Sequence, residues 1–415
     1  MRVLIVSQYF VPEPVILPPS IAAGLAERGH EVRVVTGYPN YPDGRIASGY
    51  RQQWRGREKH GAFGLIRVPL FIDHSQNAVR RLANYVSFGL SSASAVGAAW
   101  RADVVYVYAP QMTAAIGPWI WRLLGGPRYV LHVQDLWPES IIGSSLVSPG
   151  LLSRLATRML NPWLRDVYRR AGAVIAIAPG MRITLTERGA DPTTTELVFN
   201  WADEPAFAPD RTVHRDDAQT TKVVFAGNVG MMQDLQTAVR AAHAVRDIAG
   251  FSLTVVGGGA ALAEAQRLRD ELGADNVKFA ERVSPDQMGP IYRDSDFQLV
   301  TLKDLPVFHH TIPSKLQGAF ANARPVIISV PGDAARLVEQ SEAGFVAMPE
   351  SVASLEEAFR AAAALDHDGR AAAGAKARAF YDENMSFDES LTRIESILRR
   401  VAASSEHQQS RGISG

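Results

Sequence analysis

A chain of 415 residues is longer than a single hydrophobic core usually supports, so its length predicts two domains. Lys plus Arg number 43 and Asp plus Glu also number 43, so no overall field attracts nucleic acid, and we expect no nucleic-acid partner. The absence of cysteine excludes disulfides, thiolate metal ligands and cysteine nucleophiles, and it fits a reducing compartment.

The N-terminal segment Met1–Ser7 carries one basic residue and a short apolar run, which predicts a buried strand rather than a signal peptide. The longest mostly apolar stretch, Tyr85–Trp100, is interrupted by Ser and Gly and is more typical of a packed helix than of a membrane span. We therefore expect no transmembrane helix and a cytoplasmic location.

The first half of the chain alternates short apolar runs with helical segments. Ser20–Arg28 predicts a helix that Gly29 ends. Strands that are apolar throughout and separated by helices are typical of a parallel sheet covered on both faces. The expected strands of this half are Val3–Val6, Glu31–Thr36, Leu65–Pro69, Val104–Tyr108, Tyr129–Val133, Val174–Ala178 and Glu196–Phe199.

The polar run Arg211–Thr221, preceded by Pro205 and Pro209, predicts a linker between domains. The alternation of strand and helix then restarts. The fold class we predict is α/β, with two doubly wound, Rossmann-like domains facing a cleft and ligands beyond the carboxyl ends of the strands. The expected strands here are Val223–Ala226, Ser252–Val256, Val277–Ala280, Phe297–Leu302 and Pro325–Ser329, and the expected helices are Leu235–Ala249, Ala260–Leu272, Asp286–Arg293 and Pro313–Ala321.

The loop Phe225–Gly230 is the first candidate site for a phosphate. It follows a strand and precedes a helix for which Asp234 is the expected N-cap. Two glycines allow the backbone to approach a phosphate, and free amides before the helix supply donors. A tight turn that needs positive φ explains the same residues, so the motif alone leaves both readings open. Gly257–Gly259, at the end of another strand, has the same ambiguity.

The segment Thr311–Lys315 gives a sharper signal. Thr311 or Ser314 is the expected cap of a helix whose first turn tolerates Pro313. Lys315 then lies in that first turn, where the helix dipole disfavours a cation by about 0.3–1 kcal/mol. A cation in such a place indicates a nearby anion, and a diphosphate would be stabilised by the lysine and the free amides together. A simply solvated lysine is the alternative.

Two carboxylates follow a predicted strand of the first half. Asp135 and Glu139 are suited to act as a base or to bind an acceptor hydroxyl, but an N-capping aspartate and a first-turn glutamate explain them equally well. His132 lies within the strand and is interpreted as a packed residue. His309 and His310 have no further ligands at suitable spacing, so we predict no metal site.

Together these segments resemble the family 4 glycosyltransferases, and most closely the branch that includes the WbuB-type fucosamine transferases and the WcaI-type colanic acid enzymes. The similar segments occur in one order through most of the chain, from residue 2 to about residue 350, and this joint occurrence makes the short motifs specific. They are Gln8–Pro14, Arg28–Val32, Tyr38–Gly44, Gln134–Ser140, Phe199–Trp201, Gly227–Gly230 and Ile312–Lys315.

The resemblance implies a GT-B fold, a sugar donor activated by a nucleoside diphosphate, and retention at the anomeric carbon. Together with the position of the predicted linker, the resemblance predicts an acceptor-side domain over residues 1–203. A C-terminal helix at about 385–402 completes this domain. A donor domain follows over 204–384. The Ser/Gln/Gly-rich tail, 403–415, is expected to be disordered.

The resemblance also assigns roles to residues of this chain. The expected catalytic residues are Lys315, Asp135 and Glu139. The expected donor-binding residues are Gly227, Asn228, Gly230, Gln233, Arg282, Val283, Ser314 and Lys315, with Lys315 on the diphosphate and Arg282 and Val283 beside the nucleobase. On the acceptor side we expect Pro14, Asn40, Tyr41, Gln134 and Asp135.

Two departures from the family pattern concern the donor site. Many members carry two glutamates separated by seven intervening residues, the second of which binds the ribose, whereas His310 and Gly318 stand here. The basic pair that often follows the glycine loop is represented by Asn228 and Gln233. Recognition of the ribose is therefore unexplained, and neutralisation of the phosphates falls mainly on Lys315.

The predicted acceptor is a saccharide or a polyprenyl-linked sugar, and a basic segment of the first half favours the lipid-linked form. Leu151–Ala171 places arginines among Leu and Trp163, as in a basic amphipathic helix, and Arg80, Arg81, Trp119 and Trp121 would extend that surface. This pattern predicts peripheral contact with the inner face of the membrane, while a solvated face of a packed helix explains it as well. Neither a cofactor nor a metal ion is expected, because fixed cations can replace Mg²⁺.

The predicted function is a retaining hexosyltransferase that uses a nucleotide sugar, with a UDP-hexosamine favoured, to build cell-surface polysaccharide or glycoconjugate. Two alternatives share the same two-domain architecture. One is an epimerase acting on UDP-N-acetylhexosamine, which would turn over without an acceptor. The other is a non-catalytic partner of another transferase, which would bind the nucleotide sugar without turnover.

Overall fold

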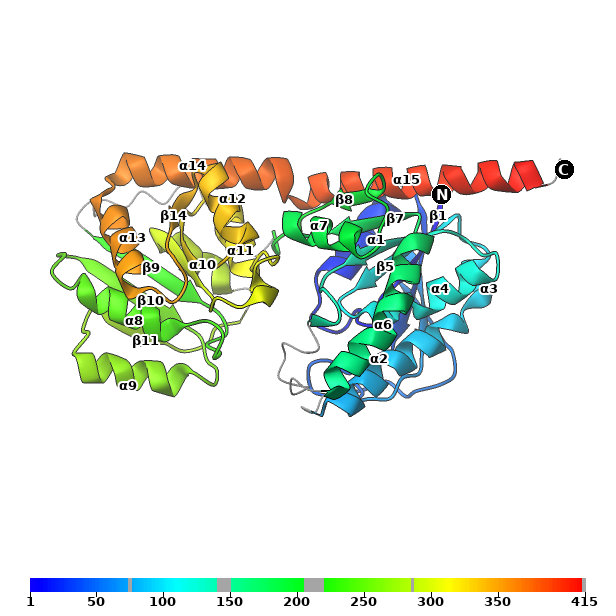
Figure 1. Ribbon diagram of the computed structural model, residues 1–415, viewed down its shortest axis with the longest axis horizontal. Helices are drawn as coiled ribbons and strands as arrows, with labels where there is room; N and C mark the ends of the chain where they lie inside the picture. The colour runs from blue at the N-terminus through cyan, green and yellow to red at the C-terminus, as the bar shows by residue number, and fades with distance from the viewer. Residues whose placement is uncertain (74–76, 140–150, 205–219, 285–286, 413–415) are drawn as a thin grey trace. The chain divides into compact units, whose positions relative to one another are not determined.

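The computed structural model describes residues 1–73, 77–139, 151–204, 220–284 and 287–412. The chain divides into two compact units (Figure 1). The first comprises Met1–Val198 and Leu391–Gly415, and the second comprises Phe199–Ser390. The division falls close to the expected boundary after residue 203, and most of the expected linker lies outside the described residues.

The first unit is built on an eight-stranded sheet in the order β3-β4-β2-β1-β5-β6-β7-β8. Neighbouring strands are parallel except β3 and β4, which are antiparallel. Strand β5 is buried along nearly its whole length, as its β-branched and aromatic sequence predicts. The strands are β1 (Arg2–Val6), β2 (Glu31–Gly37), β3 (Gly56–His60), β4 (Phe63–Val68), β5 (Val104–Ala109), β6 (Tyr129–Val133), β7 (Ala173–Ala176) and β8 (Thr195–Leu197).

Strand β3 is absent from the sequence-based expectations because of its composition. Its sequence, Gly-Arg-Glu-Lys-His, is largely exposed and shows no apolar alternation from which a strand is predicted. It pairs with β4 at the edge of the sheet, where charged side chains hinder pairing with another chain.

Helices cover both faces of this sheet (Figure 1). Helix α2 begins where the Asn77 side chain accepts the amides of Val79 and Arg80, each at 3.1 Å. Helix α4 contacts both α2 and α6. Among the described residues, no helix combines the length and the apolar character needed to cross a bilayer. The helices are α1 (Leu17–Glu27), α2 (Ala78–Ala93), α3 (Val96–Ala99), η1 (Met112–Ala115), α4 (Ile116–Leu123), α6 (Leu151–Arg170), α7 (Pro179–Glu187) and α15 (Phe387–Gly412).

The second unit is built on a six-stranded parallel sheet in the order β11-β10-β9-β12-β13-β14. One face packs against α8, α9 and α13, with Phe225, Phe297 and Phe359 fully buried in the core. The short strand β14 at the edge was not expected. The strands are β9 (Thr221–Ala226), β10 (Phe251–Val256), β11 (Val277–Ala280), β12 (Phe297–Thr301), β13 (Val326–Ser329) and β14 (Gly344–Val346). The helices are α8 (Leu235–Ala244), α9 (Leu262–Leu272), α10 (Met288–Arg293), η3 (Pro306–Phe308), α11 (Ser314–Ala321), α12 (Asp333–Ser341), α13 (Val352–Ala364) and α14 (His367–Asn384).

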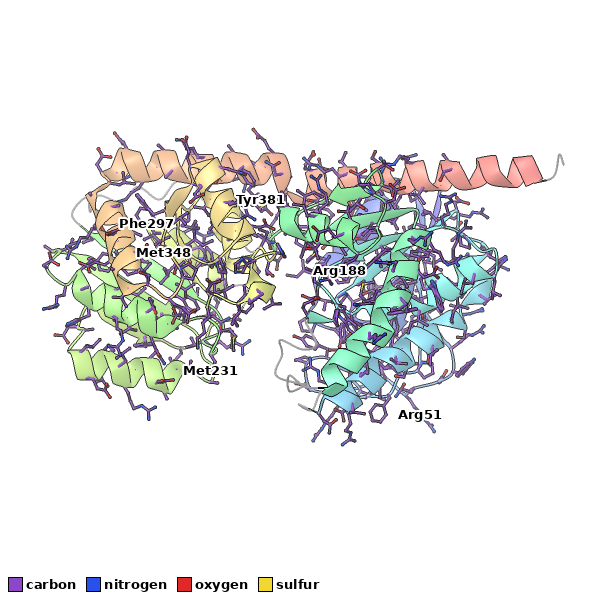
Figure 2. All side chains as sticks on the ribbon, in the orientation of Figure 1. Arg51, Arg188, Met231, Phe297, Met348 and Tyr381 are labelled. Carbon is purple, nitrogen blue, oxygen red and sulfur yellow. The ribbon has the colours of Figure 1, made fainter. Side chains whose placement is uncertain are left out.

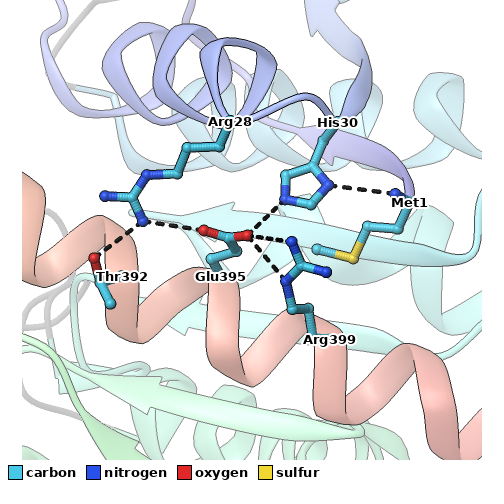
Figure 3. A network of polar contacts seen from close by, with 6 residues as sticks. All are labelled: Met1, Arg28, His30, Thr392, Glu395 and Arg399. Carbon is cyan, nitrogen blue, oxygen red and sulfur yellow. Dashed lines mark hydrogen bonds and ion pairs between the residues drawn. The ribbon is translucent and has the colours of Figure 1, made fainter.

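The part of α15 that belongs to the first unit is tied to that unit by the carboxylate of Glu395 (Figure 3). His30 Nε2 lies 2.9 Å from Glu395 Oε1, Arg28 donates to Oε2 at 3.0 Å, and Arg399 donates to Oε1 at 2.6 and 2.9 Å. Burial alone would raise the pKa of Glu395, but the hydrogen bonds from His30, Arg399 and Arg28 outweigh it and lower the pKa to about 2. A charged carboxylate therefore links the C-terminal helix to the start of the chain.

Helix α15 also differs from the expectation for the tail. The composition of residues 403–415 predicts disorder, whereas the helix continues through Gly412. Glu, Gln and Ala are favourable helix formers, and extending an existing helix requires no new nucleus. The helix therefore propagates beyond Val401, which is buried.

Candidate active site

The glycine loop of the second unit lies at the carboxyl end of β9, beside the end of β10. Gly227 has a φ of +130°, and its amide donates to the carbonyl of Val256 at 2.9 Å. The amide of Val229 donates to the carbonyl of Gly258 at 3.0 Å. The two glycine segments that the sequence presents separately therefore adjoin at the edge where parallel sheets bind ligands.

The contact between these two loops leaves no room for side chains. A Cβ atom on Gly257 would lie 1.9 Å from the carbonyl oxygen of Gly227, and one on Gly259 would lie 2.4 Å from that of Val229. Gly227, Gly257 and Gly259 also have positive φ. The tight-turn reading of these glycines is thus correct, and it does not exclude a binding role because Gly227 and Gly257 also line a cavity.

This cavity, of about 470 Å³, opens beside the loops that follow β9, β10 and β11. Its lining residues are Gly227, Asn228, Val256, Gly257, Arg282, Val283, Ser284 and Met288. Four predicted donor-binding residues are therefore brought together from loops that are distant in the sequence. Met288 is a lining residue that no motif indicates, and its only signal is its place shortly after a strand.

Gln233 stabilises the glycine loop from within. Its Oε1 accepts the amide of Gly230 at 2.9 Å, and its backbone carbonyl accepts the hydroxyl of Thr301 at 2.5 Å. A Cβ atom on Gly230 would lie 2.8 Å from Asn228 Nδ2, so Asn228 packs against the same turn. Gln233 therefore uses the oxygen of its side chain to hold the loop, and a direct contact with the donor stays a prediction.

Lys315 lies in the first turn of α11, as expected, but the helix is not capped by a side chain. Pro313, with a ψ of +138°, occupies the N-cap position. The hydroxyl of Thr311 donates instead to the carbonyl of Val307 at 3.0 Å, and Ser314 is the first helical residue. The capping expectation is therefore wrong, because the extended proline precedes the helix directly. Of the first-turn amides, that of Leu316 donates to the carbonyl of Pro313 at 2.9 Å, so within the described residues those of Ser314 and Lys315 are left to bind a ligand.

The ammonium group of Lys315 lies against the glycine loop. Its Nζ is 4.6 Å from the centroid of the Phe225 ring, and a Cβ atom on Gly227 would lie 3.3 Å from it. Burial lowers the pKa of Lys315 to about 8, because desolvation penalises the charged form. Within the described part of the chain, no carboxylate forms an ion pair with this lysine. A desolvated cation without an anionic partner is a functional-site candidate.

The loop before α11 contains one of the two positions at which many family members carry a glutamate. In this chain, a carboxylate from α12 lies close to that loop. His310 Nδ1 lies 3.8 Å from Asp333 Oδ2, and Asp333 also pairs with Arg336. The buried Asp333 donates its amide to the carbonyl of His309 at 2.9 Å. This carboxylate comes from α12 and is partly neutralised by its arginine. Among the described residues, no group of His, Asp and Glu side chains could hold a metal ion.

In the first unit, the buried carboxylate of Glu13 joins the loops that follow β1 and β2. It accepts the amides of Phe10 at 2.9 Å, Asn40 at 2.8 Å and Tyr41 at 2.9 Å. Desolvation raises the pKa of Glu13, while these three hydrogen bonds oppose the shift. The predicted acceptor-side residues Asn40 and Tyr41 are thereby fixed near Pro14. Motif reasoning missed this positioning role, although a glutamate within a proline-rich apolar loop is a signal for it.

Asp135 and Glu139 both follow β6 but have different neighbours. The amide of Gln134 donates to the carbonyl of Ala109 at 3.0 Å and so anchors the start of this loop. Asp135 keeps an exposed surface, yet the surrounding protein atoms desolvate its carboxyl group and raise its pKa to about 6. Glu139 forms a two-pronged ion pair with Arg188, at 2.7 and 2.9 Å. Figure 2 labels Arg188 in the first unit. Of the two carboxylates, Asp135 is the one that pairs with no arginine among the described residues.

A chain of buried amides lies beneath the loops of the first unit. Gln111 Nε2 donates to Gln8 Oε1 at 2.5 Å, Gln8 Nε2 donates to Asn84 Oδ1 at 2.7 Å, and Asn84 Nδ2 donates to the carbonyl of Phe71 at 2.6 Å. Such a network fixes the loops because an unpaired buried amide is costly. Isolated amides give no periodic signal in the sequence. His132 is fully buried as well, burial lowers its pKa to about 3, and its interpretation as a packed residue is confirmed.

The surface expected around α6 is only partly present. Exposed arginines of this helix include Arg158, Arg165 and Arg169. Trp163 packs edge-on against Trp119, with ring centroids 6.4 Å apart. Trp121, however, is fully buried, and its Nε1 donates to the carbonyl of Ala93 at 2.9 Å. The expectation that Trp121 extends the surface is wrong, because it lies on the inner face of α4.

Each unit is a doubly wound sheet with the candidate site residues in loops at the carboxyl ends of its strands, and a pair of such units is the GT-B architecture of glycosyltransferases. The fold is shared with Anabaena HepE in complex with UDP and glucose, at a TM-score of 0.65 and 17% identity over 96% of this chain and 99% of that chain. It is shared also with WaaG, a glycosyltransferase involved in lipopolysaccharide biosynthesis, at a TM-score of 0.62 and 17% identity over 96% and 99%.

Sequence comparison identifies the family. Residues 19–201 match the glycosyl transferase 4-like domain, and residues 220–364 match the glycosyl transferases group 1 domain. The chain is 27% identical over 315 residues to WcaI of Escherichia coli K12, provisionally described as a colanic acid biosynthesis glycosyl transferase, with 74% of this chain and 76% of that protein covered. The chain therefore belongs to the glycosyltransferases that combine a glycosyl transferase 4-like domain with a group 1 domain, and it is similar to WcaI.

Proposed function

We propose that this glycosyltransferase moves a sugar from a UDP-sugar, of the hexosamine type, to a saccharide or polyprenyl-linked acceptor, with retention at the anomeric carbon. The observation that carries the proposal is the half-buried Lys315, whose ammonium group is desolvated and lies beside the glycine loop. The product belongs to a cell-surface polysaccharide or glycoconjugate. The descriptions of WcaI, in colanic acid biosynthesis, and of WaaG, in lipopolysaccharide biosynthesis, support that context.

Lys315 and the adjoining backbone are suited to a diphosphate leaving group. The first turn of α11 offers amides that no side chain caps, and Gly227 allows the ligand to approach the backbone. When the sugar departs, negative charge develops on the diphosphate. A fixed cation and pre-oriented amides stabilise that charge without reorganisation. The scheme requires neither a metal ion nor another cofactor.

Uracil is the base that we propose for the nucleotide donor. The HepE structures contain UDP, UDP with glucose, or UDP-glucose. In this chain, the cavity beside the glycine loop has the size of a small-molecule site and is bounded by Arg282, Val283 and Met288. The apolar side chains of Val283 and Met288 can pack on a base. Gly227 lines the same cavity, where its backbone would lie close to the phosphates of the bound nucleotide.

Retention without an enzyme nucleophile fits departure and attack on the same face of the sugar. The acceptor hydroxyl approaches as the diphosphate leaves, through an oxocarbenium-like state, so the protein mainly aligns the reactants and stabilises charge. Asp135 is the proposed ligand or base for the acceptor hydroxyl. The pairing of Glu139 with Arg188 leaves this role to Asp135.

The pH dependence of kcat/KM is expected to be bell-shaped for the wild-type enzyme. Asp135 must be ionised, which sets an acid limb near pH 6, and Lys315 must be protonated, which sets an alkaline limb near pH 8. Asp135→Asn is expected to lower kcat/KM by about 10²-fold and to remove the acid limb. Glu187→Gln, at an exposed position of the same unit, serves as the control and should keep the wild-type acid limb. An acid limb that is unchanged in Asp135→Asn would contradict the assignment.

If the acceptor is linked to a lipid, the enzyme works in the cytoplasm, at the inner face of the membrane. The exposed arginines Arg158, Arg165 and Arg169 of α6 are the proposed contacts with anionic headgroups. The adjoining Trp163 suits the interface between headgroups and acyl chains. A protein that fails to co-sediment with anionic vesicles at low salt would contradict this contact.

The donor class is tested by thermal unfolding in the presence of nucleotides. At about 100 times its Kd, UDP is expected to stabilise the second unit by roughly 2.7 kcal/mol, which corresponds to a Tm rise of roughly 5–10 °C. UMP at the same concentration should stabilise less, because it lacks the phosphate that faces Lys315. GDP, ADP and dTDP test the base. If none of these nucleotides raises the Tm, the proposed donor site is wrong.

A further inference from the structure

A second cavity, of about 310 Å³, lies in the first unit between β4 and α3. Two of its lining residues, Arg33 and Arg101, lie near the amino end of β2 and just before β5. Asn40 and Asp135 follow the carboxyl ends of their strands. Because the strands are parallel, this cavity is separate from the acceptor-side loops, and the proposed function gives it no role.

The charged residues that line this cavity are four arginines and one glutamate: Arg33, Arg55, Arg57, Arg101 and Glu58. The only carboxylate among them is already engaged, since Glu58 accepts a hydrogen bond from the buried Arg67 at 2.8 Å. Arg33 pairs with Glu31 at 2.9 Å. The other three arginines form no ion pair within the part of the chain that the structure describes. The cavity therefore holds positive charge that the protein does not neutralise.

Large apolar side chains accompany these arginines at the surface. Trp54, Val96 and Trp100 are 66%, 44% and 47% exposed. Each of them directly precedes a residue that lines the cavity. Tryptophan beside arginine is typical of surfaces that meet the headgroup region of a bilayer.

We propose that this cavity binds a phosphate group through Arg55, Arg57 and Arg101. Guanidinium groups suit this ligand because their planar donors match phosphate oxygens in pairs, and a bound anion relieves the repulsion among the three cations. The phosphate can belong to the headgroup of an anionic phospholipid or to a soluble phosphate ester. The exposed Trp54 and Trp100 contribute in the first case only.

The experiment compares the full-length protein with two triple variants. In the cavity variant, Arg55, Arg57 and Arg101 are replaced by alanine. In the control variant, the exposed arginines Arg182, Arg240 and Arg267 are replaced, so that both lose the same charge. Binding is measured to inorganic phosphate, to phosphatidylcholine vesicles and to vesicles that also contain phosphatidylglycerol. Thermal unfolding of both variants checks the fold, and Arg101→Ala alone provides a milder substitution.

We expect the cavity variant to lose at least about tenfold in affinity for a phosphate-bearing probe, with the control variant close to wild type. A loss for phosphatidylglycerol vesicles alone, accompanied by a loss in Trp54→Ser, assigns the site to a lipid headgroup. A loss for inorganic phosphate as well assigns it to a soluble phosphate. If the cavity variant binds both probes as tightly as wild type, or the control variant loses as much, the proposal is wrong.

Discussion

Replacing Lys315 with alanine is expected to lower kcat by more than about 10²-fold, the scale for loss of one pre-oriented group that stabilises leaving-group charge. The lysine approaches the glycine loop closely, and no carboxylate in the described part of the chain neutralises it. Its charge is therefore available to the diphosphate. Steady-state kinetics with a UDP-sugar and an acceptor measure the effect, and UDP affinity should fall in parallel.

The pH profile separates this role from a merely structural one. Since burial lowers the pKa of Lys315 to about 8, the wild-type enzyme is expected to lose kcat/KM above that pH, where the free lysine becomes neutral. The alkaline limb should be absent in Lys315→Ala. Lys278→Ala, at an exposed position of β11, removes a lysine from the same unit and should keep both the rate and the limb. Activity of Lys315→Ala within a few-fold of wild type would refute the assignment.

Gly257→Ala is expected to disrupt the donor site by forcing the two glycine loops apart. The added Cβ atom would lie 1.9 Å from the carbonyl oxygen of Gly227, and the backbone at this position has a φ of +146°, which alanine adopts only with strain. We expect a loss of about 1–3 kcal/mol in the free energy of unfolding and a large loss of UDP affinity. Urea unfolding and nucleotide titration measure the two effects.

The neighbouring glycine supplies the control for this substitution. A Cβ atom on Gly258 would meet no atom within 4 Å, so Gly258→Ala should change the free energy of unfolding by no more than about 0.5 kcal/mol. The two variants differ only in which residue of the same turn carries the methyl group. Equal effects of the two substitutions would show that the close contact between the loops does not govern donor binding.

The sequence predicts most of the sheets, because central parallel strands are buried on both faces and leave continuous apolar runs. Strand β1 and strand β9 fall within a residue or two of their expected bounds. The edge strands β3 and β14 escape prediction, because one is charged and the other has only three residues. The helical tail escapes it as well, because a solvated extension of a helix and a disordered segment have similar compositions.

The sequence predicted those site residues whose position follows from the ends of strands and helices. It did not predict those whose role depends on contacts with distant segments. The glycine loop, Lys315 and Arg282 stand at strand and helix ends, so the topology of the fold brings them to one edge of the sheet. The engagement of Glu139 by Arg188 and the anchoring of two loops by Glu13 depend on partners that no local pattern reveals. The same holds for the extended Pro313, which takes the place of the expected cap.

The sequence by itself determined the α/β class and the restart of the pattern in a second domain, and it indicated the residues that we propose to bind a diphosphate. These features follow from periodicity and from backbone chemistry, which act over a few residues. Only the tertiary structure decided which charges remain unpaired. Within the described residues, Lys315 and the cavity arginines Arg55, Arg57 and Arg101 have no carboxylate partner, whereas Glu139 is paired with Arg188. Burial and pairing arise between segments distant in the chain, and they determine which ionisable side chains are free to meet a ligand.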